Sequence, residues 1–489
     1  MNHYAIRYFL GYILRLEALF LAPSLIIALV QREGAAFRAL AVTILLSAVL
    51  SLIPLIREKP DRTLSHREGF VIVALSWIVM SLVGALPFTL AGAIPSYLDA
   101  FFEVVSGFTT TGASILTNVE AMPMSLLYWR SFTNWLGGMG ILVFALAVIP
   151  LSQGHGDTLH VLRAESPGPS VGKLVPTMRH SARILYAIYV VLTVAEILLL
   201  LLGGMPLFDA VTHAFATAGT GGFSIKNASM AAYSSYLQGV VAVFLILFGI
   251  NFNLYYLVLV GKLSQAFRSE ELRVYLGLVA GSVLLIAVNI RTLFSSAGEA
   301  LHHSFFQVAS IITTAGFATA DFNLWPQLSR VILVILSLVG ACAGSTGGGI
   351  KIARIVLLWK AAKRAIQRAL HPRSVKVIRM DDKPVEPEVL DGTLTFMIAY
   401  SLITIVSVLL VALDNFDFET TLTSVIACFN NIGPGLSMVG PTGNFAAFSP
   451  FSKLVLSADM LLGRLEIFPM LLLFAPSVWR GRRQRKNVS

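Results

Sequence analysis

The sequence contains four short, uncharged polar segments that each end in glycine and each lie between two long apolar stretches. The segments are Ser106–Gly112, His213–Gly219, Ser310–Gly316 and Ala427–Gly433. Successive glycines lie about a hundred residues apart, and the residue two positions before each glycine is Thr, Thr, Thr or Asn. A chain that repeats a polar loop between two membrane spans four times can enclose an ion pore with four-fold pseudosymmetry.

The composition excludes a soluble globular protein. Of the 489 residues, 56% are hydrophobic and only 13% are charged, and the mean hydropathy is +0.78. Long runs without Asp, Glu, Lys or Arg include Phe70–Leu98, Ser131–Gly154, Asn227–Gly261, Val274–Ile290, Val331–Ile350 and Gly392–Leu413. Most of these can cross a hydrocarbon core, which takes about 20 helical residues. We expect ten spans, two in an N-terminal hairpin and two in each repeat.

The net charge of +10 could indicate nucleic acid, but the placement of the charges argues against it. Basic residues cluster between alternate spans, with the largest groups at Arg354–Lys383 and Arg480–Lys486. This is the positive-inside pattern, and it predicts a multi-pass protein of the plasma membrane with both termini in the cytoplasm. No cleavable signal peptide is expected, because Tyr4–Val30 is interrupted by Arg15 and Glu17 and is interpreted as a retained span.

The predicted fold is all-α and polytopic, with four tandem repeats in a pseudo-four-fold arrangement around a pore and an N-terminal two-helix hairpin. Each repeat consists of a span, a short re-entrant half-helix that enters near Asp99, Asp209, Glu299 or Glu419, a glycine loop and a second span. The expected boundaries are 1–68 for the hairpin, 69–155, 156–265 and 266–385 for the first three repeats, and 386–489 for the fourth repeat with its basic tail.

The second span of the third repeat is interrupted by glycines. Gly340–Gly349 contains five of them, and each costs about 1 kcal/mol in a helix interior. We therefore expect a broken helix with a loop inside the membrane, followed by a basic cytoplasmic helix that ends near Leu370. The segment does not fit a phosphate-binding loop, because Ile350 separates Gly349 from Lys351. It does not fit a nucleophile elbow either, because Ala343 occupies the first glycine position of the motif before Ser345.

The glycine loops are suited to binding dehydrated cations. Such pores replace the hydration shell with backbone carbonyl oxygens, and glycine adopts the required dihedral angles at low cost. The Thr or Asn side chains can add ligands or brace the loop. The alternative, ordinary extracellular turns, does not account for four loops at matched offsets.

At these residues the sequence resembles the Trk/Ktr/HKT superfamily of potassium transporters, and within it the membrane subunits of the bacterial Trk system. The resemblance covers essentially the whole chain, and the N-terminal hairpin is similar to the Trk rather than the Ktr type. It is carried by Thr109–Ser114, Ala218–Phe223, Asn251–Asn253, Thr313–Phe317, Gly344–Lys351, Asn430–Gly435 and Gly463–Glu466.

The resemblance implies potassium uptake across the bacterial inner membrane, with K⁺ as the transported ion and no organic cofactor in this chain. It implies a homodimer and a cytoplasmic nucleotide-binding regulatory subunit of the TrkA type. The implied selectivity filter comprises Thr110, Thr111, Gly112, Thr217, Ala218, Gly219, Thr314, Ala315, Gly316, Asn431, Ile432 and Gly433. Apart from the four glycines, these residues would bind K⁺ through their carbonyl groups.

The resemblance also implies a gate below the filter. The expected gating residues are Gly344, Ser345, Thr346, Gly347, Gly348, Gly349 and Arg464. A charge at the depth of Arg464 is costly in a membrane, so it is either functional or paired, with Glu466 or Asp459 as the candidate partner.

Several alternatives remain open on the sequence. A Na⁺-permeable or H⁺- or Na⁺-coupled symporter of the same family would carry the same loops, although a serine at the first filter glycine goes with Na⁺ in the plant branch and Gly112 is glycine here. An intramembrane enzyme would need converging polar residues that the charge-free spans lack. The basic stretch Lys360–Lys383 suits either anionic membrane lipid or a regulatory partner. His302, His303, Cys342 and Cys428 are expected to be packing or interfacial residues rather than metal ligands.

Overall fold

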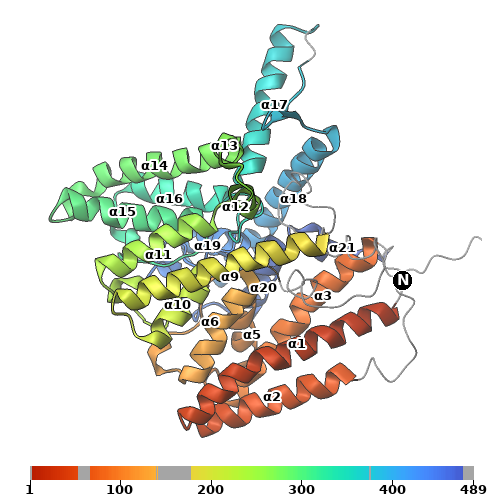
Figure 1. Ribbon diagram of the computed structural model, residues 1–489, viewed down its shortest axis with the longest axis vertical. Helices are drawn as coiled ribbons and strands as arrows, with labels where there is room; N and C mark the ends of the chain where they lie inside the picture. Colours follow the sequence, from red (N-terminus) through yellow and green to blue (C-terminus); the bar gives the residue numbers. More distant parts are fainter. Residues whose placement is uncertain (1–2, 53–65, 139, 141–177, 374–375, 477–489) are drawn as a thin grey trace, which may run out of the picture.

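The computed structural model describes residues 3–52, 66–138, 140, 178–373 and 376–476, and this part of the chain is almost entirely helical (Figure 1). Two helices form the N-terminal hairpin, α1 (His3–Val30) and α2 (Gly34–Leu52), which pack against each other and, through α1, on the body of the molecule. The charges of α1 do not interrupt it, because the Arg15 guanidinium donates to the Oγ and carbonyl of Ser51 on α2 and Glu17 is buried.

Each of the four repeats contains a long first helix, a half-helix and a second helix. The first helices are α3 (His66–Gly84), α9 (Met178–Leu202), α14 (Glu270–Ile290) and α18 (Pro387–Val411). The half-helices are α5 (Tyr97–Phe108), α10 (Leu207–Ala218), α15 (Ala297–Ile312) and α19 (Phe418–Phe429). The second helices are α6 (Met124–Gly138), α11 (Ser235–Phe248), α16 (Gln327–Val339) and α20 (Pro450–Arg464).

The half-helices begin where the acidic residues predicted them. Asp99, Asp209, Glu299 and Glu419 each lie in the first turn of one of them. Three of the four also begin with a side-chain cap, from Ser96, Ser296 or Asp417 to a backbone N–H of the first turn. The acid stabilises the positive end of the helix dipole and the cap satisfies one of its free N–H groups.

The repeats close into a ring, because the second helix of each repeat packs on the half-helix of the next. The pairs are α6 with α10, α11 with α15, α16 with α19, and α20 with α5. Polar contacts join three of these pairs: Gln238 with His302 (2.7 Å), Arg330 with Glu419, and Lys453 with Asp99 (2.7 Å). The last pair joins the fourth repeat to the first, as the predicted pseudo-four-fold arrangement requires.

The second helices of the second and fourth repeats are interrupted, which the sequence analysis did not expect. Within the described residues, six helices are long and apolar enough to cross a membrane (both helices of the hairpin and the first helix of each repeat), or seven if the bent pair α11–α12 counts as one span. Only the third repeat was expected to be broken. In the structure α11 is followed by α12 (Phe252–Leu259) after a bend of 88°, and α20 ends at Arg464 before α21 (Phe468–Phe474).

The predicted break in the third repeat is present. Helix α16 ends at Val339, and α17 (Ile352–Leu370) begins after a segment that we call the break loop (Gly340–Lys351). Helix α17 ends at the predicted residue, Leu370. In Figure 1 it extends out of the body at the top, across the direction of α14 and α9.

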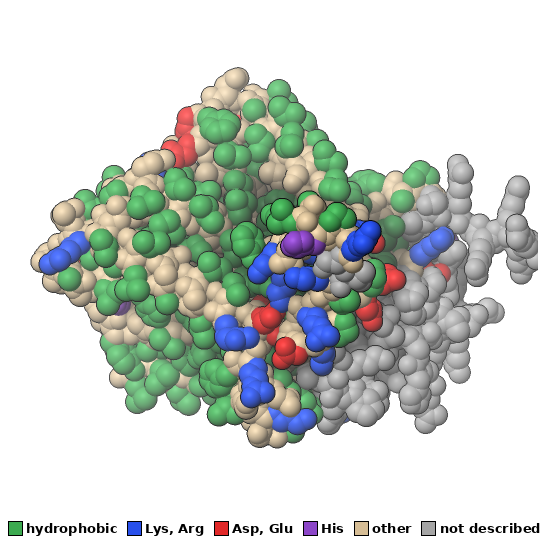
Figure 2. Space-filling view, turned by 90° about the horizontal axis from the view of Figure 1, so that it is seen from above, with side chains coloured by type: hydrophobic (Ala, Val, Ile, Leu, Met, Phe, Trp, Pro, Cys, Tyr) green, Lys and Arg blue, Asp and Glu red, His purple; other side chains and the backbone are tan. Residues whose placement is uncertain are grey.

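Shorter elements complete the described chain. They are α4 (Leu86–Leu90), α13 (Leu263–Arg268), the 3₁₀ turns η2 (Val119–Ala121), η3 (Ser229–Ala232), η4 (Arg291–Leu293), η5 (Phe322–Leu324), η6 (Ala412–Asp414) and η7 (Ser437–Val439), and the strands β1 (Arg379–Met380) and β2 (Lys383–Pro384). The two strands form an antiparallel hairpin in which Met380 pairs with Lys383. Basic side chains gather around the projecting end of α17 and this hairpin (Figure 2). Most of the predicted soluble stretch 152–181 lies outside the described residues.

The charge distribution predicts opposite sides for two exposed positions, Leu324 in η5 and Arg368 in α17. A cysteine at 324 should react in intact cells with a membrane-impermeant thiol reagent, whereas a cysteine at 368 should react only after the membrane is permeabilised. Cys342 and Cys428, both buried, are replaced by Ser in this background. Labelling of position 368 from outside would reject the predicted orientation.

Candidate functional site

All four half-helices end in the same unusual turn. In each, the residue after the C-cap has a positive φ although it is not glycine: Thr110 (55°), Thr220 (52°), Thr314 (61°) and Asn431 (56°). The N–H of this residue donates to the carbonyl three residues before it, and the N–H of the next residue donates to the carbonyl five residues before its own position. This is the pattern of the Schellman motif. Glycine is usual at this position, and a β-branched residue there costs about 1–2 kcal/mol. Repetition of this strain in four places points to a functional site.

A glycine with positive φ follows two residues later in every repeat. These are Gly112 (81°), Gly222 (66°), Gly316 (85°) and Gly433 (92°). We call the four turns, Thr109–Gly112, Gly219–Gly222, Thr313–Gly316 and Asn430–Gly433, the ring loops.

The second ring loop lies three residues later than the sequence predicted. Thr217 and Ala218 are the last residues of α10 and Gly219 is its C-cap, so the positions equivalent to Thr110, Thr111 and Gly112 are Thr220, Gly221 and Gly222. The segment contains three glycines, and the first of them has another role. A Cβ on Gly219 would overlap the carbonyl of Asn134 in α6, so this glycine allows two helices to approach closely. The dipeptides Gly222-Phe223 and Gly316-Phe317 could have indicated the correct alignment.

The ring loops touch one another in cyclic order. A Cβ added to Gly112, Gly222, Gly316 or Gly433 would lie within 3.0 Å of one backbone carbonyl oxygen, that of Gly221, Ala315, Ile432 and Thr111 respectively. Each of these carbonyls belongs to the residue before the glycine of the following repeat, and the fourth loop meets the first. Glycine is therefore required at all four positions, for its positive φ and for the space that a Cβ would take.

On one side of this ring lies a hollow of about 180 Å³, which is lined by all four of these glycines. Its walls are the chain segments that follow the ring loops, and one basic side chain joins two of them. Arg130 of α6 is buried, pairs with Glu103 (2.7 Å), donates to the carbonyl of Ser224 (3.0 Å) and lies 3.5 Å from the ring centroid of Phe223. Glu103 in turn accepts from the hydroxyl of Ser114 and the N–H of Ile115. This network joins the first and second repeats beside the ring.

In two repeats, a polar side chain of the half-helix bonds the chain segment that follows the ring loop, and the two side chains lie at equivalent positions. Glu103 and His213 both lie five residues before the end of their half-helices, and each bonds a serine two residues after the ring glycine, Ser114 or Ser224 (His213 Nε2 to Ser224 Oγ, 3.0 Å). The sequence analysis missed both. A repeat alignment through Gly112-Ala113-Ser114 and Gly222-Phe223-Ser224 would have found them.

The break loop lies on the opposite side of the ring, against the strained residues. The N–H of Gly348 donates to the Thr314 hydroxyl (2.6 Å), and the Thr220 hydroxyl lies 3.4 Å from that of Thr346. A Cβ on Gly348 would overlap the carbonyl of Asn430. The predicted gating segment thus contacts three of the four ring loops, and a glycine is needed at its closest approach.

Arg464 connects the break loop to a neighbouring repeat. Its guanidinium donates to the carbonyl of Thr346 (2.8 Å) and to the carbonyls of Gly137 (2.5 Å) and Gly138 (2.8 Å) at the end of α6. The two carboxylates expected as partners of Arg464 bond other residues. Glu466 pairs with Arg354 of α17 (2.5 Å), and Asp459 accepts from Ser407 (2.7 Å).

The break loop is hydrogen-bonded to the unexpected break between α11 and α12. The carbonyl of Gly249 accepts from the N–H of Cys342 (3.1 Å), and the N–H of Phe252 donates to the carbonyl of Gly344 (3.0 Å). Asn251 caps α12 by accepting from the N–H of Asn253. A continuous helix would have no free carbonyl or N–H here, so the break in the second repeat supplies the partners for the break in the third.

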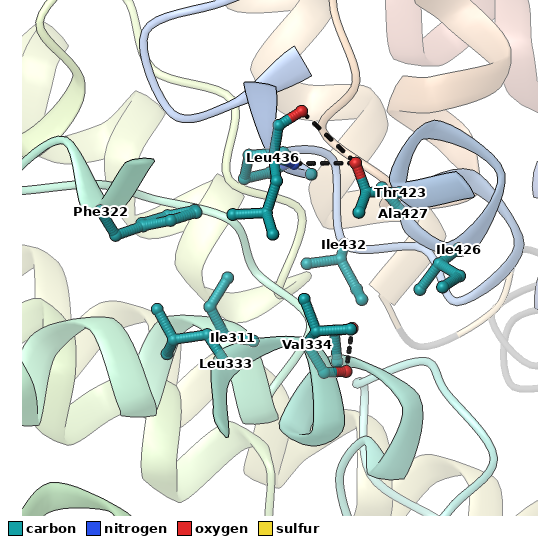
Figure 3. A pocket seen from close by; sticks show the side chains of 12 residues that line it. Ile311, Phe322, Leu333, Val334, Thr423, Ile426, Ala427, Ile432 and Leu436 are labelled. Atoms are coloured by element: carbon teal, nitrogen blue, oxygen red, sulfur yellow. Dashed lines mark hydrogen bonds between the residues drawn. The ribbon is translucent and has the colours of Figure 1, made fainter. Parts of the chain in front are cut away.

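An apolar pocket of about 20 Å³ lies behind the fourth ring loop (Figure 3). Ile311, Leu333, Ile426 and Ile432 point into it, and the Thr423 hydroxyl bonds the backbone of Leu436 at its edge. The volume suffices for about one water molecule, but the apolar walls offer it few partners. The pocket is a packing gap between the third and fourth repeats rather than a ligand site.

The described residues contain no group of three or more His, Cys, Asp or Glu side chains that could hold a metal ion. His302 contacts Gln238, His303 contacts the Thr319 hydroxyl (2.9 Å), and both cysteines are buried free thiols.

Comparison with known proteins gives a consistent result. Residues 34–480 match the family model of TrkH, described as cation transport protein. The chain is 40% identical over 464 residues to the Trk system potassium uptake protein TrkH of Salmonella typhimurium, covering 93% of this chain and 95% of that protein. It is 39% identical to the protein of the same name from Escherichia coli K12, with the same coverage. The crystal structure of the potassium transporter TrkH from Vibrio parahaemolyticus superposes with a TM-score of 0.88 at 34% identity, covering 98% of this chain and all of that one.

The contact between Gly348 and Thr314 predicts a destabilised variant. Thr314→Val keeps the shape and the β-branch, so the backbone strain is unchanged, but it leaves the buried N–H of Gly348 without its acceptor. We expect the free energy of unfolding to fall by about 1–3 kcal/mol. The control is Thr404→Val in α18, where the lost hydroxyl donates to the carbonyl of Tyr400 in its own helix. Equal thermal unfolding midpoints for the two purified variants would contradict the prediction.

Proposed function

Because the chain belongs to the TrkH family of cation transport proteins, we propose that it takes up potassium ions through the opening enclosed by the four ring loops. It is a multi-pass membrane protein of potassium transport, as its apolar helices and its relatives indicate. K⁺ is the transported ion, and the proposal requires no organic cofactor and no catalytic residue.

The single observation that carries the proposal is the cyclic contact between ring glycines and backbone carbonyls. A dehydrated cation needs several oxygen ligands at one depth, and a ring of carbonyls from four repeats can supply them. The half-helices reinforce the site, because their C-terminal ends carry the negative part of the helix dipole and end at the ring loops.

The proposed filter residues follow the alignment of the ring loops. They are Thr110, Thr111, Gly112, Thr220, Gly221, Gly222, Thr314, Ala315, Gly316, Asn431, Ile432 and Gly433. In the second repeat, Thr220 and Gly221 replace Thr217 and Ala218 as the proposed carbonyl ligands, because Thr217 and Ala218 end α10.

We further propose that the break loop and Arg464 form the gate. The break loop, with Gly344–Gly349 at its centre, blocks the path sterically, since Thr346 and Gly348 contact the ring loops from below. Arg464 adds a charge at the same depth and ties the loop to α6. Two unit charges 4 Å apart repel by about 4 kcal/mol at an effective dielectric of 20, which corresponds to about a thousandfold suppression of ion entry.

The basic residues of α17 and of the β1–β2 hairpin are the proposed docking surface for a cytoplasmic nucleotide-binding regulatory subunit. Lys363 and Arg368 are exposed on α17, which continues directly from the break loop, and Lys383 is exposed on β2. We propose in addition that the protein acts as a homodimer in the inner membrane, with both termini in the cytoplasm.

Ion flux into proteoliposomes tests the filter. The parent protein should carry K⁺ in preference to Na⁺, and both Gly112→Ser and Gly222→Ser should lower the K⁺/Na⁺ flux ratio, because the added side chain displaces a carbonyl of the next loop. Gly219→Ser is the matched control. This substitution should reduce the yield of folded protein, because the new side chain clashes with the Asn134 carbonyl. The protein that does insert should keep the K⁺/Na⁺ flux ratio of the parent.

An imposed proton gradient in the same vesicles separates a channel from a proton-coupled symporter, since only the latter would accumulate K⁺ against its own gradient. A parent protein that carries no K⁺ under either condition would refute the proposed function.

Substitution of Arg464 separates its charge from its role as a tether. Arg464→Ala should raise K⁺ flux and make it less dependent on the regulatory subunit, and deletion of residues 344–349 should do the same. Arg464→Lys keeps the charge, but its compact ammonium replaces the planar fork whose two nitrogens bond the carbonyls of Thr346 and of α6. A low flux in this variant would therefore assign the barrier to charge. If the Ala and deletion variants insert normally and conduct no faster than the parent, the barrier lies elsewhere.

A further inference from the structure

One buried carboxylate bonds the backbone on both sides of the Gly344–Gly349 segment. Glu271 lies in the first turn of α14, and its side chain is 4% exposed. Its Oε1 accepts the N–H of Ala343 (2.6 Å), just before Gly344, and the N–H of Ala353 (3.2 Å), in the first turn of α17. A single oxygen thus joins the two sides of the Gly344–Gly349 segment.

The bond to Ala353 caps α17 from outside. Lys351, the N-cap residue of α17, makes no side-chain capping bond, and it has a positive φ of 79°. The N–H groups of a first helical turn need an acceptor, and a negative charge is favourable there. Glu271, which lies on α14, supplies both the acceptor and the negative charge to the first turn of α17. Bonds from backbone N–H groups to a carboxylate are also stronger than those to a neutral acceptor.

The residue before Glu271 connects the same turn to the cytoplasmic elements. The carboxylate of Glu270 pairs with Lys360 of α17, and its N–H donates to Asp381 Oδ1 (2.7 Å) in the turn between β1 and β2. The first turn of α14 therefore holds α17 and the hairpin through Glu270, and the break loop through Glu271. The break loop also packs directly on the hairpin, because Ala343 shares an apolar cluster with Met380 of β1 and Leu390 of α18. The two glutamates of α14 add the polar link between the break loop, α17 and the hairpin turn.

We propose that Glu271 is a positioning residue that latches the break loop in its blocking position, and that displacement of α17 releases the loop through it. The inference rests on the proposed function of the break loop as a gate. It assigns the latch to one side chain, and it gives the cytoplasmic surface a physical connection to the pore that a docked partner can act on.

The thiol of Cys342 reports the position of the loop without any transport measurement. Cys342 lies within the break loop and is fully buried. In a Cys428→Ser background, Glu271→Ala should raise the rate of Cys342 modification by a membrane-permeant maleimide about tenfold, since two charge-assisted bonds are lost. Glu271→Gln retains an oxygen acceptor and should give an intermediate rate. The control is Glu388→Ala, in the exposed first turn of α18, which should match the parent.

Flux through the same variants completes the test. Glu271→Ala should raise regulator-independent K⁺ flux and leave the K⁺/Na⁺ ratio unchanged, whereas general damage to the fold would lower flux or alter the ratio. Parental rates of both thiol modification and flux in inserted Glu271→Ala or Glu271→Gln protein would overturn the latch. If deletion of residues 344–349 still raises flux in that case, the gate stands and only the latch is wrong. If the deletion has no effect, the gate fails, and Cys342 modification alone decides whether Glu271 holds the loop.

Discussion

The structure depends on the contact between each ring glycine and a backbone carbonyl of the next repeat. No side chain fits at these four contacts, so the ends of the half-helices must approach one another to backbone distance. The second helix of each repeat holds the half-helix of the next at that distance, and the pair Lys453–Asp99 closes the circle between the last repeat and the first. The surrounding helices can be understood as the scaffold that this close approach requires.

The strained residues before the glycines show why the ring is not built from glycine alone. Thr or Asn at a positive φ costs free energy, but each provides a side chain at the lower face of the ring. Asn431 donates to Thr111 (3.0 Å) and so links the fourth loop to the first, whereas Thr220 and Thr314 contact the break loop. The ring is four-fold in its backbone, but its side chains differ. Those of the first and fourth loops bond to each other, and those of the second and third loops contact the break loop, which also meets the backbone of the fourth loop at Asn430.

The interruptions of the second helices are complementary. The gap between α11 and α12 frees a carbonyl and an N–H that bind the break loop, and the turn after Arg464 places Glu466 and Ile467 at positive φ. Helix α20 ends at this turn, and its last side chain, that of Arg464, reaches the carbonyls of α6 and of the break loop. Interrupted helices are tolerated at membrane depth only when other parts of the protein satisfy the freed backbone groups, and here the interruptions satisfy one another.

The sequence by itself determined the hairpin, the four repeats, the first turns of the half-helices and the break before α17, because hydropathy, acidic first turns and clustered glycines act locally. It also identified three of the four ring loops. The tertiary structure decided the rest. A threonine stands two positions before Gly219 and also before Gly222, and the neighbour of each glycine, the Asn134 carbonyl or the third ring loop, distinguishes their roles. The partners of Arg464 and Glu271 were likewise undetermined, because a charge can pair with any group that folding brings near, and these groups come from distant repeats.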